Sequence, residues 1–166
     1  RSIPLESAIG DNLFLNELDT ALGKAQQQAG IGQFEMIGLD ACLMGHIEVM
    51  DALAPHARYA VFSQETEPAL GWAYTAFLDQ LAKNPDQDGA TLSNSIVQSY
   101  IDQDQRILDD QARTEWTGSR SSAQAVKNQL SRDITLTAVD LSRTGDLIQN
   151  LNQFAFTLQS ADQKAV

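Results

Sequence analysis

The chain has 166 residues, which is enough for one compact domain with a hydrophobic core and too few for two domains of ordinary size. Hydrophobic residues make up 43% of the sequence, so the composition favours a folded domain over a disordered one. The formal net charge is −11 and the Lys and Arg residues are scattered, which argues against a nucleic-acid binder. No apolar run approaches the roughly 20 residues of a membrane-spanning helix.

Apolar periodicity and the positions of Gly and Pro predict alternating helices and strands. The first expected elements are a helix over 14–30, which ends at Gly30, and a buried strand over 34–41. The other expected elements are a helix over 42–54, a strand over 57–65, helices over 73–84 and 91–105, a strand over 134–142 and a helix over 144–160. Residues 106–132 are polar and weakly periodic, so we expect an exposed loop with room for one helix within 121–130.

This order of elements predicts an α/β fold, in which a mostly parallel sheet carries helices on both faces. In such folds, active residues gather beyond the carboxyl ends of the strands. Asp40 and Cys42 follow the first strand, and Ser63 and Glu65 follow the second. Because the two strands are consecutive, we expect the sequences LDAC and FSQE to lie side by side on one rim of the sheet.

The only cysteine, Cys42, is expected at the first position of the helix over 42–54. The free N–H groups and the helix dipole at such a position favour a thiolate, and the same N–H groups can stabilise an oxyanion. Cys42 is therefore a candidate nucleophile. A buried structural thiol is the alternative, because free cysteines are common in protein cores, and the position alone leaves both open.

The two histidines, His46 and His56, are candidate bases for a cysteine nucleophile. His46 lies four residues after Cys42 and would share a helix face with it. A nucleophile at the first helical position points off the helix end, however, so His46 would stand behind it. His56 falls in a connection before a strand, and we expect neither histidine to be the base. A metal site from His46, Glu48 and Asp51 lacks a third ligand at convincing spacing.

Acidic and aromatic residues are expected on the same rim as Cys42. Asp40 can point into the crevice toward a cationic side chain or cap the following helix, and the two roles can coexist. Glu65 and Glu67 either add negative charge to the rim or are solvated loop acids. Trp72, with Tyr74 nearby, either forms a wall for a peptide or covers the edge of the core.

The stretch IGLDACLMGHIEVMDAL, followed by YAVFSQETEPALGWAYTAFL, resembles the clostripain-like cysteine peptidases of the caspase-like clan. The shared features are a strand followed by D-A-C-L-M, a next strand ending in S-Q-E, and a Pro…Gly-Trp-x-Tyr loop. The segment ITLTAVDLS and the helix after it are also similar to a later strand and helix of the family. The resemblance covers most of residues 11–160 and implies a partial caspase-like three-layer sandwich.

The resemblance implies roles for individual residues. Cys42 would be the nucleophile, and its amide would share the oxyanion hole with a glycine outside this sequence. Asp40 would line the pocket for a basic side chain, because relatives cleave after Arg or Lys, and Ser63, Glu65 and Trp72 would complete the substrate-binding rim. The substrate would be a peptide or protein.

The family's base is a histidine in a His-Gly motif at the end of an earlier strand. We therefore expect residues 1–166 to be a single caspase-like domain fragment that lacks this strand. Its partner would be the His-bearing chain of the same precursor. Without that partner, we expect the fragment to be inactive. Relatives often carry an acid before the Trp, where this chain has Leu70. Basic specificity would then depend on Asp40, alone or with Glu65 or Glu67.

The resemblance also sets the remaining expectations. We expect no cofactor; calcium is the alternative because some relatives respond to it, although the chain has no EF-hand-like loop. Relatives are mostly bacterial and exported, so a secreted or cell-envelope location is expected. The competing functions are a non-catalytic caspase-like binding or scaffold domain and a cysteine acyl-hydrolase that uses His46 or His56.

Overall fold

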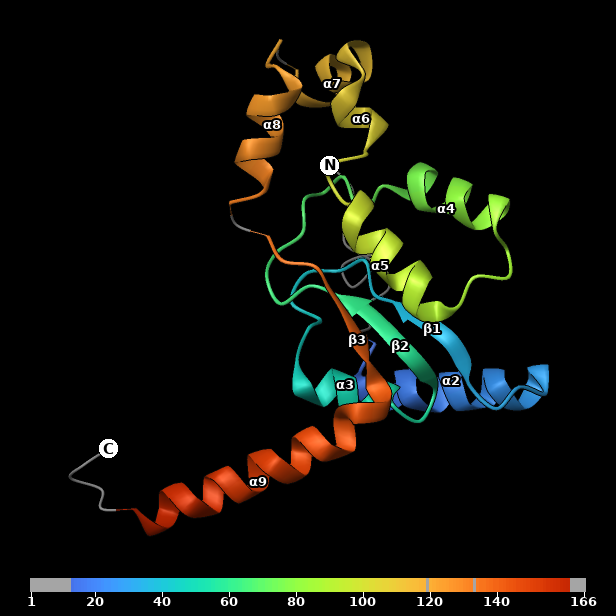
Figure 1. Ribbon diagram of the computed structural model, residues 1–166, viewed down its shortest axis with the longest axis vertical. Helices are drawn as coiled ribbons and strands as arrows, with labels where there is room; N and C mark the ends of the chain where they lie inside the picture. Colours follow the sequence, from blue (N-terminus) through green and yellow to red (C-terminus); the bar gives the residue numbers. More distant parts are fainter. Residues whose placement is uncertain (1–12, 119, 133, 162–166) are drawn as a thin grey trace.

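The computed structural model describes residues 13–118, 120–132 and 134–161, and a small sheet lies at its centre (Figure 1). The described strands follow the order β1 (Phe34–Gly38), β2 (Ala57–Phe62) and β3 (Thr137–Asp140). β1 and β2 are parallel, whereas β3 runs antiparallel to β2. The sheet is therefore mixed, and β3 departs from a purely parallel arrangement.

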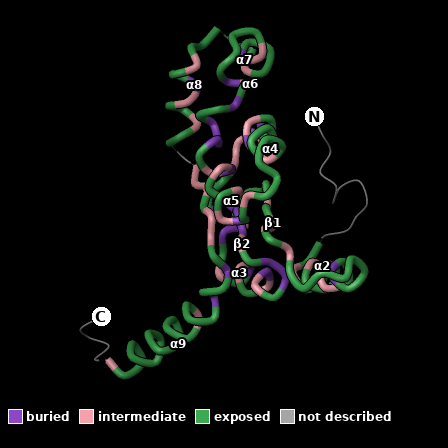
Figure 2. Tube along the Cα trace, turned by 45° about the vertical axis from the view of Figure 1, so that its right-hand side comes forward, coloured by how far each residue is buried: buried purple, intermediate pink, exposed green. Residues whose placement is uncertain are grey.

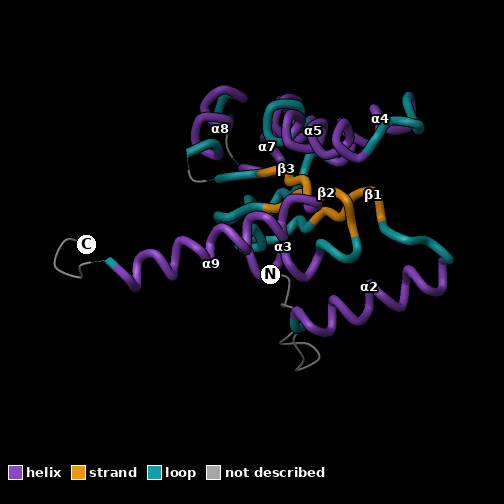
Figure 3. The backbone as a smooth tube through the Cα atoms, turned by 60° about the horizontal axis from the view of Figure 1, so that its bottom comes forward, coloured by secondary structure: helices purple, strands orange, loops and turns teal. Residues whose placement is uncertain are grey.

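Helices cover both faces of the sheet, which confirms the predicted α/β fold (Figure 3). One face carries α2 (Leu15–Ala29), α3 (Ile47–Leu53), the 3-10 turn η1 (Leu141–Arg143) and the start of α9 (Thr144–Ser160). The other face carries α4 (Tyr74–Lys83) and α5 (Gly89–Ser99). Beyond the strand ends lie α6 (Gln105–Leu108), α7 (Asp110–Thr117) and α8 (Ala123–Leu130).

Each face of the sheet has its own hydrophobic core, and β2 contributes to both. Val61 packs with Ile96 and Ile107 on the side of α5 and α6. Phe62 packs with Leu53 on the side of α3. Neighbouring residues of a strand point to opposite faces, so this alternation fixes the register of β2 and the place where it ends.

The predicted helix over 42–54 is wrong in its first turn, because α3 begins only at Ile47. Residues 41–46 form a turn instead. The amide of Leu43 donates to the carbonyl of Glu65 at 3.2 Å, and that of Gly45 donates to Ser63 at 2.7 Å. Between these two contacts the segment reverses its direction beside the chain that follows β2. The left-handed backbone of Leu43 is incompatible with a helical turn at this place.

Residues 106–132 are not an exposed loop, and this prediction is also wrong. They form most of α6 together with α7 and α8, of which only α8 falls within the helix expected over 121–130. The segment contributes Ile107 and Val126 to the hydrophobic core, and Arg113 is buried with its guanidinium hydrogen-bonded to the backbone. Its guanidinium donates to the carbonyls of Ile107 at 2.7 Å and Ser121 at 2.7 Å.

The long helix α9 confirms the helix expected over 144–160, and it projects away from the sheet (Figure 1). Almost all of it is exposed (Figure 2), including large apolar side chains such as Phe154 and Phe156. None of the helices in the described ranges is both long enough and apolar enough to cross a membrane.

Candidate active site

Cys42 lies in the turn after β1 and faces the chain that follows β2. Its thiol is exposed, so it is not a core cysteine. The amide of Glu67 donates to the Cys42 Sγ at 3.2 Å, and the Sγ lies 3.8 Å from the Glu67 carbonyl oxygen. The predicted place at a helix N-terminus is wrong, because α3 starts five residues later.

The turn that carries Cys42 has a constrained backbone. Leu43 adopts a left-handed conformation with φ of 64°, which is uncommon for a residue with a branched side chain. Gly45 is buried, and a Cβ there would lie 2.9 Å from the backbone nitrogen of Gln64. Glycine thus allows the two strand ends to approach closely. Backbone strain of this kind is often found at functional sites.

The predicted rim exists. Leu39 donates to the carbonyl of Val61 at 2.9 Å, and the pairing continues through Leu43 and Glu65. The sequences LDAC and FSQE therefore lie side by side, as expected. Glu65 is an exposed residue of this rim. Ser63 is fully buried. Its hydroxyl donates to the Glu65 carbonyl at 2.9 Å and lies 3.1 Å from Thr135 Oγ1, so Ser63 supports the loop that follows β2 from the interior of the protein.

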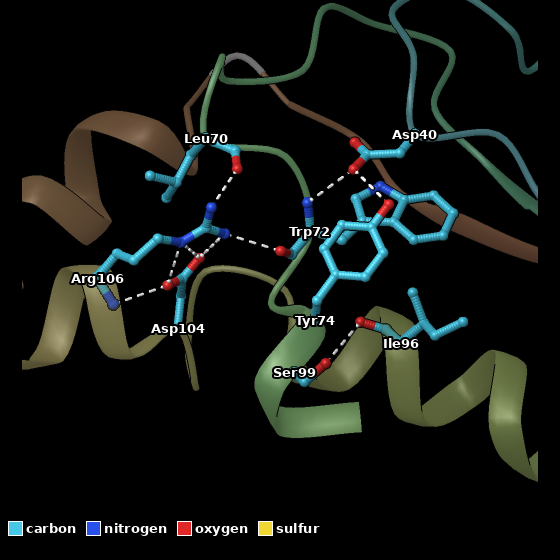
Figure 4. A network of polar contacts seen from close by, with 8 residues as sticks. All are labelled: Asp40, Leu70, Trp72, Tyr74, Ile96, Ser99, Asp104 and Arg106. Atoms are coloured by element: carbon cyan, nitrogen blue, oxygen red, sulfur yellow. Dashed lines mark hydrogen bonds and ion pairs between the residues drawn. The ribbon is translucent and has the colours of Figure 1, made fainter. Parts of the chain in front are cut away.

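Asp40 binds the loop between β2 and α4. Its Oδ2 accepts hydrogen bonds from the amide of Trp72 at 3.1 Å and from the hydroxyl of Tyr74 at 2.9 Å (Figure 4). Gly71 lets the loop pass this close, since its φ is 70° and a Cβ would lie 2.7 Å from Asp40 Oδ2. Asp40 does not cap α3, whose N-cap is His46. Burial, and next the contact with Asp40, raise the pKa of Tyr74 to about 12.

Glu67 is the second acid beside Asp40. The indole N–H of the buried Trp72 donates to Glu67 Oε2 at 3.1 Å. Burial raises the pKa of Glu67 to about 8, and the neighbouring carboxylate of Asp40 adds to the effect, while the Trp72 donor opposes it. The protonated form of Glu67 is therefore favoured beside an ionised Asp40.

Arg106 holds the loop from the opposite side (Figure 4). Its guanidinium donates to the carbonyls of Leu70 at 2.5 Å and Trp72 at 2.8 Å. It also pairs with Asp104 at 2.6 Å, and Asp104 is only 3% exposed. Sequence reasoning missed Arg106 because it lies 34 and 36 residues from these contacts, in a segment without a clear pattern.

Within the described ranges, the hydrogen-bond contacts of the Cys42 thiol are with Glu67 and not with a histidine, so the structure gives the acyl-hydrolase alternative no support. His56 precedes β2, about 20 Å of strand away from the rim that follows it. Its ring nitrogens lie 2.6 Å from Gln26 Oε1 and 2.7 Å from Asp19 Oδ1, so it joins α2 to the sheet. His46 is exposed, and its ring makes no hydrogen bond or ion pair within the described ranges.

The metal site considered for His46, Glu48 and Asp51 does not form. Within 13–118, 120–132 and 134–161, no group of three or more His, Cys, Asp or Glu side chains could hold a metal ion. Asp40 and Glu67 are neighbouring acids, and the backbone amide of Glu67 contacts the thiol.

The sequence and the fold were compared with those of known proteins. The model of the clostripain family of peptidases matches residues 6–166. No curated protein is detectably similar in sequence. Among solved structures, a cysteine protease from B. fragilis is similar, with 20% identity and a TM-score of 0.56, over 82% of this chain and 47% of that chain.

Two structures from Bacteroides thetaiotaomicron are also similar. One is a clostripain in complex with the peptide inhibitor BTN-VLTK-AOMK, with 17% identity and a TM-score of 0.53, over 84% of this chain and 48% of that one. The other is a secreted cysteine protease in complex with an irreversible peptide inhibitor, with 20% identity and a TM-score of 0.52, over 82% of this chain and 33% of that one.

The chain thus spans less than half the length of each of these solved proteins. At these identities the likeness shows the fold, which agrees with the helix-covered sheet described above. The family model covers nearly the whole sequence, including Cys42 and its rim. The predicted resemblance is confirmed, and the chain belongs to the clostripain family.

Proposed function

We propose that this chain is the nucleophile-bearing portion of a cysteine endopeptidase that prefers Arg or Lys on the acyl side of the cleaved bond. The observation that carries the proposal is the exposed thiol of Cys42 in contact with the backbone of Glu67, on the rim that also carries the acid Asp40, at the carboxyl ends of β1 and β2. This rim offers a nucleophile together with acids that can select a basic side chain.

In the proposed reaction the Cys42 thiolate adds to the peptide carbonyl carbon. The amine leaves with a proton from the base, and water then hydrolyses the thioester. The Cys42 amide has no hydrogen-bond partner within the described residues, so it is available to the oxyanion. The base is a histidine supplied by another portion of the same precursor, which is the chain's partner.

The pocket for the basic side chain is formed by Asp40 and the loop that carries Trp72. Leu70 is buried and its carbonyl points to Arg106, so it offers no charge to a substrate. The inhibitor of one similar structure is a peptide that contains lysine, and another similar protein is secreted. Both similarities support a peptide substrate and an exported location for the present protein.

Labelling of the full-length protein with an arginyl chloromethyl ketone tests the proposed function. We expect one adduct per molecule, on Cys42, found by mass spectrometry of the digested protein. A chloromethyl ketone with a neutral side chain should react more slowly, because it does not bind the acidic pocket. If Cys42 is not labelled in the full-length protein, the peptidase proposal is wrong and the non-catalytic caspase-like domain becomes the better description.

Asp40→Ala should weaken cleavage after Arg about 10-fold or more, because it removes a charge partner of the basic side chain. Alkylation of Cys42 by iodoacetamide should change much less, since that small reagent does not use the pocket. The two rates are measured on the same preparation of the full-length variant. Equal loss of both rates would mean that Asp40 supports the loop through Trp72 and Tyr74 and does not select the substrate.

A further inference from the structure

The acids Asp40 and Glu67 are held together by one residue, because Trp72 donates its amide to Asp40 at 3.1 Å and its indole N–H to Glu67 at 3.1 Å. Glu67 is half-buried, and burial and the nearby Asp40 raise its pKa. Like charges at close range cannot both be ionised at low cost, so one carboxyl keeps its proton. Glu67 Oε1 is a buried atom without a hydrogen-bond partner among the described residues. Glu67 Oε1 therefore lacks a hydrogen-bond donor. A proton shared with Asp40 or the side chain of an incoming cation can fill this place.

A second observation points to the same place. Tyr100 is 8% exposed, and its hydroxyl has no hydrogen-bond partner within the described part of the chain. Tyr100 belongs to the same hydrophobic cluster as Trp72, whose indole N–H donates to Glu67. Burial raises the pKa of Tyr100, and the charges of Glu67, Asp40 and Cys42 raise it further. A buried phenol without a partner therefore belongs to the cluster that supports the acid pair.

The other charged and titratable groups around Glu67 are few. Asp40 accepts from Tyr74, and Cys42 contacts the Glu67 backbone. Arg106 lies on the far side of the loop, where Asp104 and two backbone carbonyls occupy its donors. Arg106 is thus engaged elsewhere, and these residues offer the acid pair no ion-pair partner of its own.

We propose that Glu67 is the second acid of the specificity pocket, and that an Arg or Lys side chain of the substrate binds between Glu67 and Asp40 by replacing a shared proton, which is released to solvent. This inference rests on the peptidase function proposed above and adds to it a residue and a coupled proton. Glu67 takes over the charge that Leu70 does not supply, and its backbone contact with Cys42 places the pocket next to the nucleophile.

The coupling gives substrate selection a pH dependence of known sign. The pKa of Glu67 is raised to about 8, so below that pH a cationic side chain must displace a proton, and above it the pair is already ionised. Arg and Lys stay charged throughout this range. Preference for a basic side chain therefore rises with pH, by up to about tenfold per pH unit, and levels off above the pKa of Glu67.

The test compares two peptides that differ only in Arg or its neutral isostere citrulline, cleaved by the full-length protein between about pH 6 and 9. The ratio of their kcat/KM values cancels the titration of the nucleophile and base, because both peptides use the same ones. We expect this ratio to rise with pH. In Glu67→Gln we expect it to be lower by about 10-fold above pH 8 and nearly independent of pH.

Asp79→Asn is the matched control, because it removes one carboxylate from the exposed surface of α4 and should keep the ratio and its pH profile. The inference is wrong if the ratio of the two kcat/KM values does not change with pH in the unmodified protein, or if Glu67→Gln leaves the ratio unchanged. Cleavage of the citrulline peptide in the same experiment would still support the peptidase function. Equal loss with both peptides would make Glu67 a loop residue and would also overturn the inference. So would a ratio that collapses in a chelator, because a metal ion would then occupy the pair. If neither peptide is cleaved and Cys42 is not labelled, both proposals fail.

Discussion

Cys42→Ala in the full-length protein is expected to lower kcat for a peptide with Arg at the cleavage site by on the order of 10⁴-fold or more. The substitution removes the atom that would form the thioester, so only transition-state binding remains. The protein should stay folded, because Cys42 is exposed and its side chain fills no core position. Steady-state kinetics and thermal unfolding of the same preparation measure the two effects.

Cys42→Ser is the companion variant, since it keeps the size of the side chain and replaces the thiol with a much weaker nucleophile. It should be nearly as inactive as Cys42→Ala. Activity within about tenfold of the unmodified protein in either variant would mean that another group performs the attack. The role of the rim would then have to be sought in binding.

Arg106→Gln is expected to have the second largest effect. The guanidinium joins the Leu70 and Trp72 carbonyls to Asp104, so its loss frees the loop that presents Trp72 to Asp40. We expect kcat/KM for the Arg peptide to fall about 30- to 100-fold through misplacement of this loop. The free energy of unfolding should fall by about 2 kcal/mol, a value reduced because the Arg106 side chain is 43% exposed.

Arg58→Gln is the matched control for charge, because Arg58 pairs with Glu35 at an exposed site, at 3.4 Å. It should change the free energy of unfolding by about 0.5 kcal/mol or less and leave kcat/KM unaffected. Arg106→Lys should rescue only part of the activity, since an ammonium cannot reach two carbonyls and a carboxylate in the same plane. An Arg106→Gln variant no less stable and no less active than Arg58→Gln would show that the loop holds its position without this contact.

The fold was predictable where apolar periodicity reports burial directly. The strand ARYAVF and the helices over 73–84 and 144–160 were found in this way. The first turn of the helix predicted over 42–54 does not form, although its apolar residues have helical spacing. Backbone hydrogen bonds from this segment to Ser63 and Glu65 outweigh that local preference. The prediction for residues 106–132 was wrong because the few apolar residues that this segment buries, Ile107 and Val126, are too widely spaced to form a clear pattern, and backbone carbonyls accept the hydrogen bonds of its buried Arg113.

The site was predictable in its position and only partly in its members. Strand ends and their order placed Asp40 and Cys42 on one rim with Glu65, and the structure agrees. The contact of Glu67 with Asp40 depends on the path of a loop, which neither composition nor spacing specifies. Tyr100 and Arg106 come from elements packed against that loop, so only a three-dimensional arrangement reveals them.

The amides of Leu43 and Gly45 donate to the carbonyls of Glu65 and Ser63, so the turn that carries Cys42 is held at two points by the chain that follows β2. Leu43 reverses the chain between these two contacts, and a side chain at Gly45 would collide with the backbone of Gln64. The number of residues between Asp40 and Gly45 is thus a fixed dimension of the site. Natural or designed variation here should keep the length of the segment together with Cys42 and Gly45, and should be tolerated at an exposed neighbour such as Ala41.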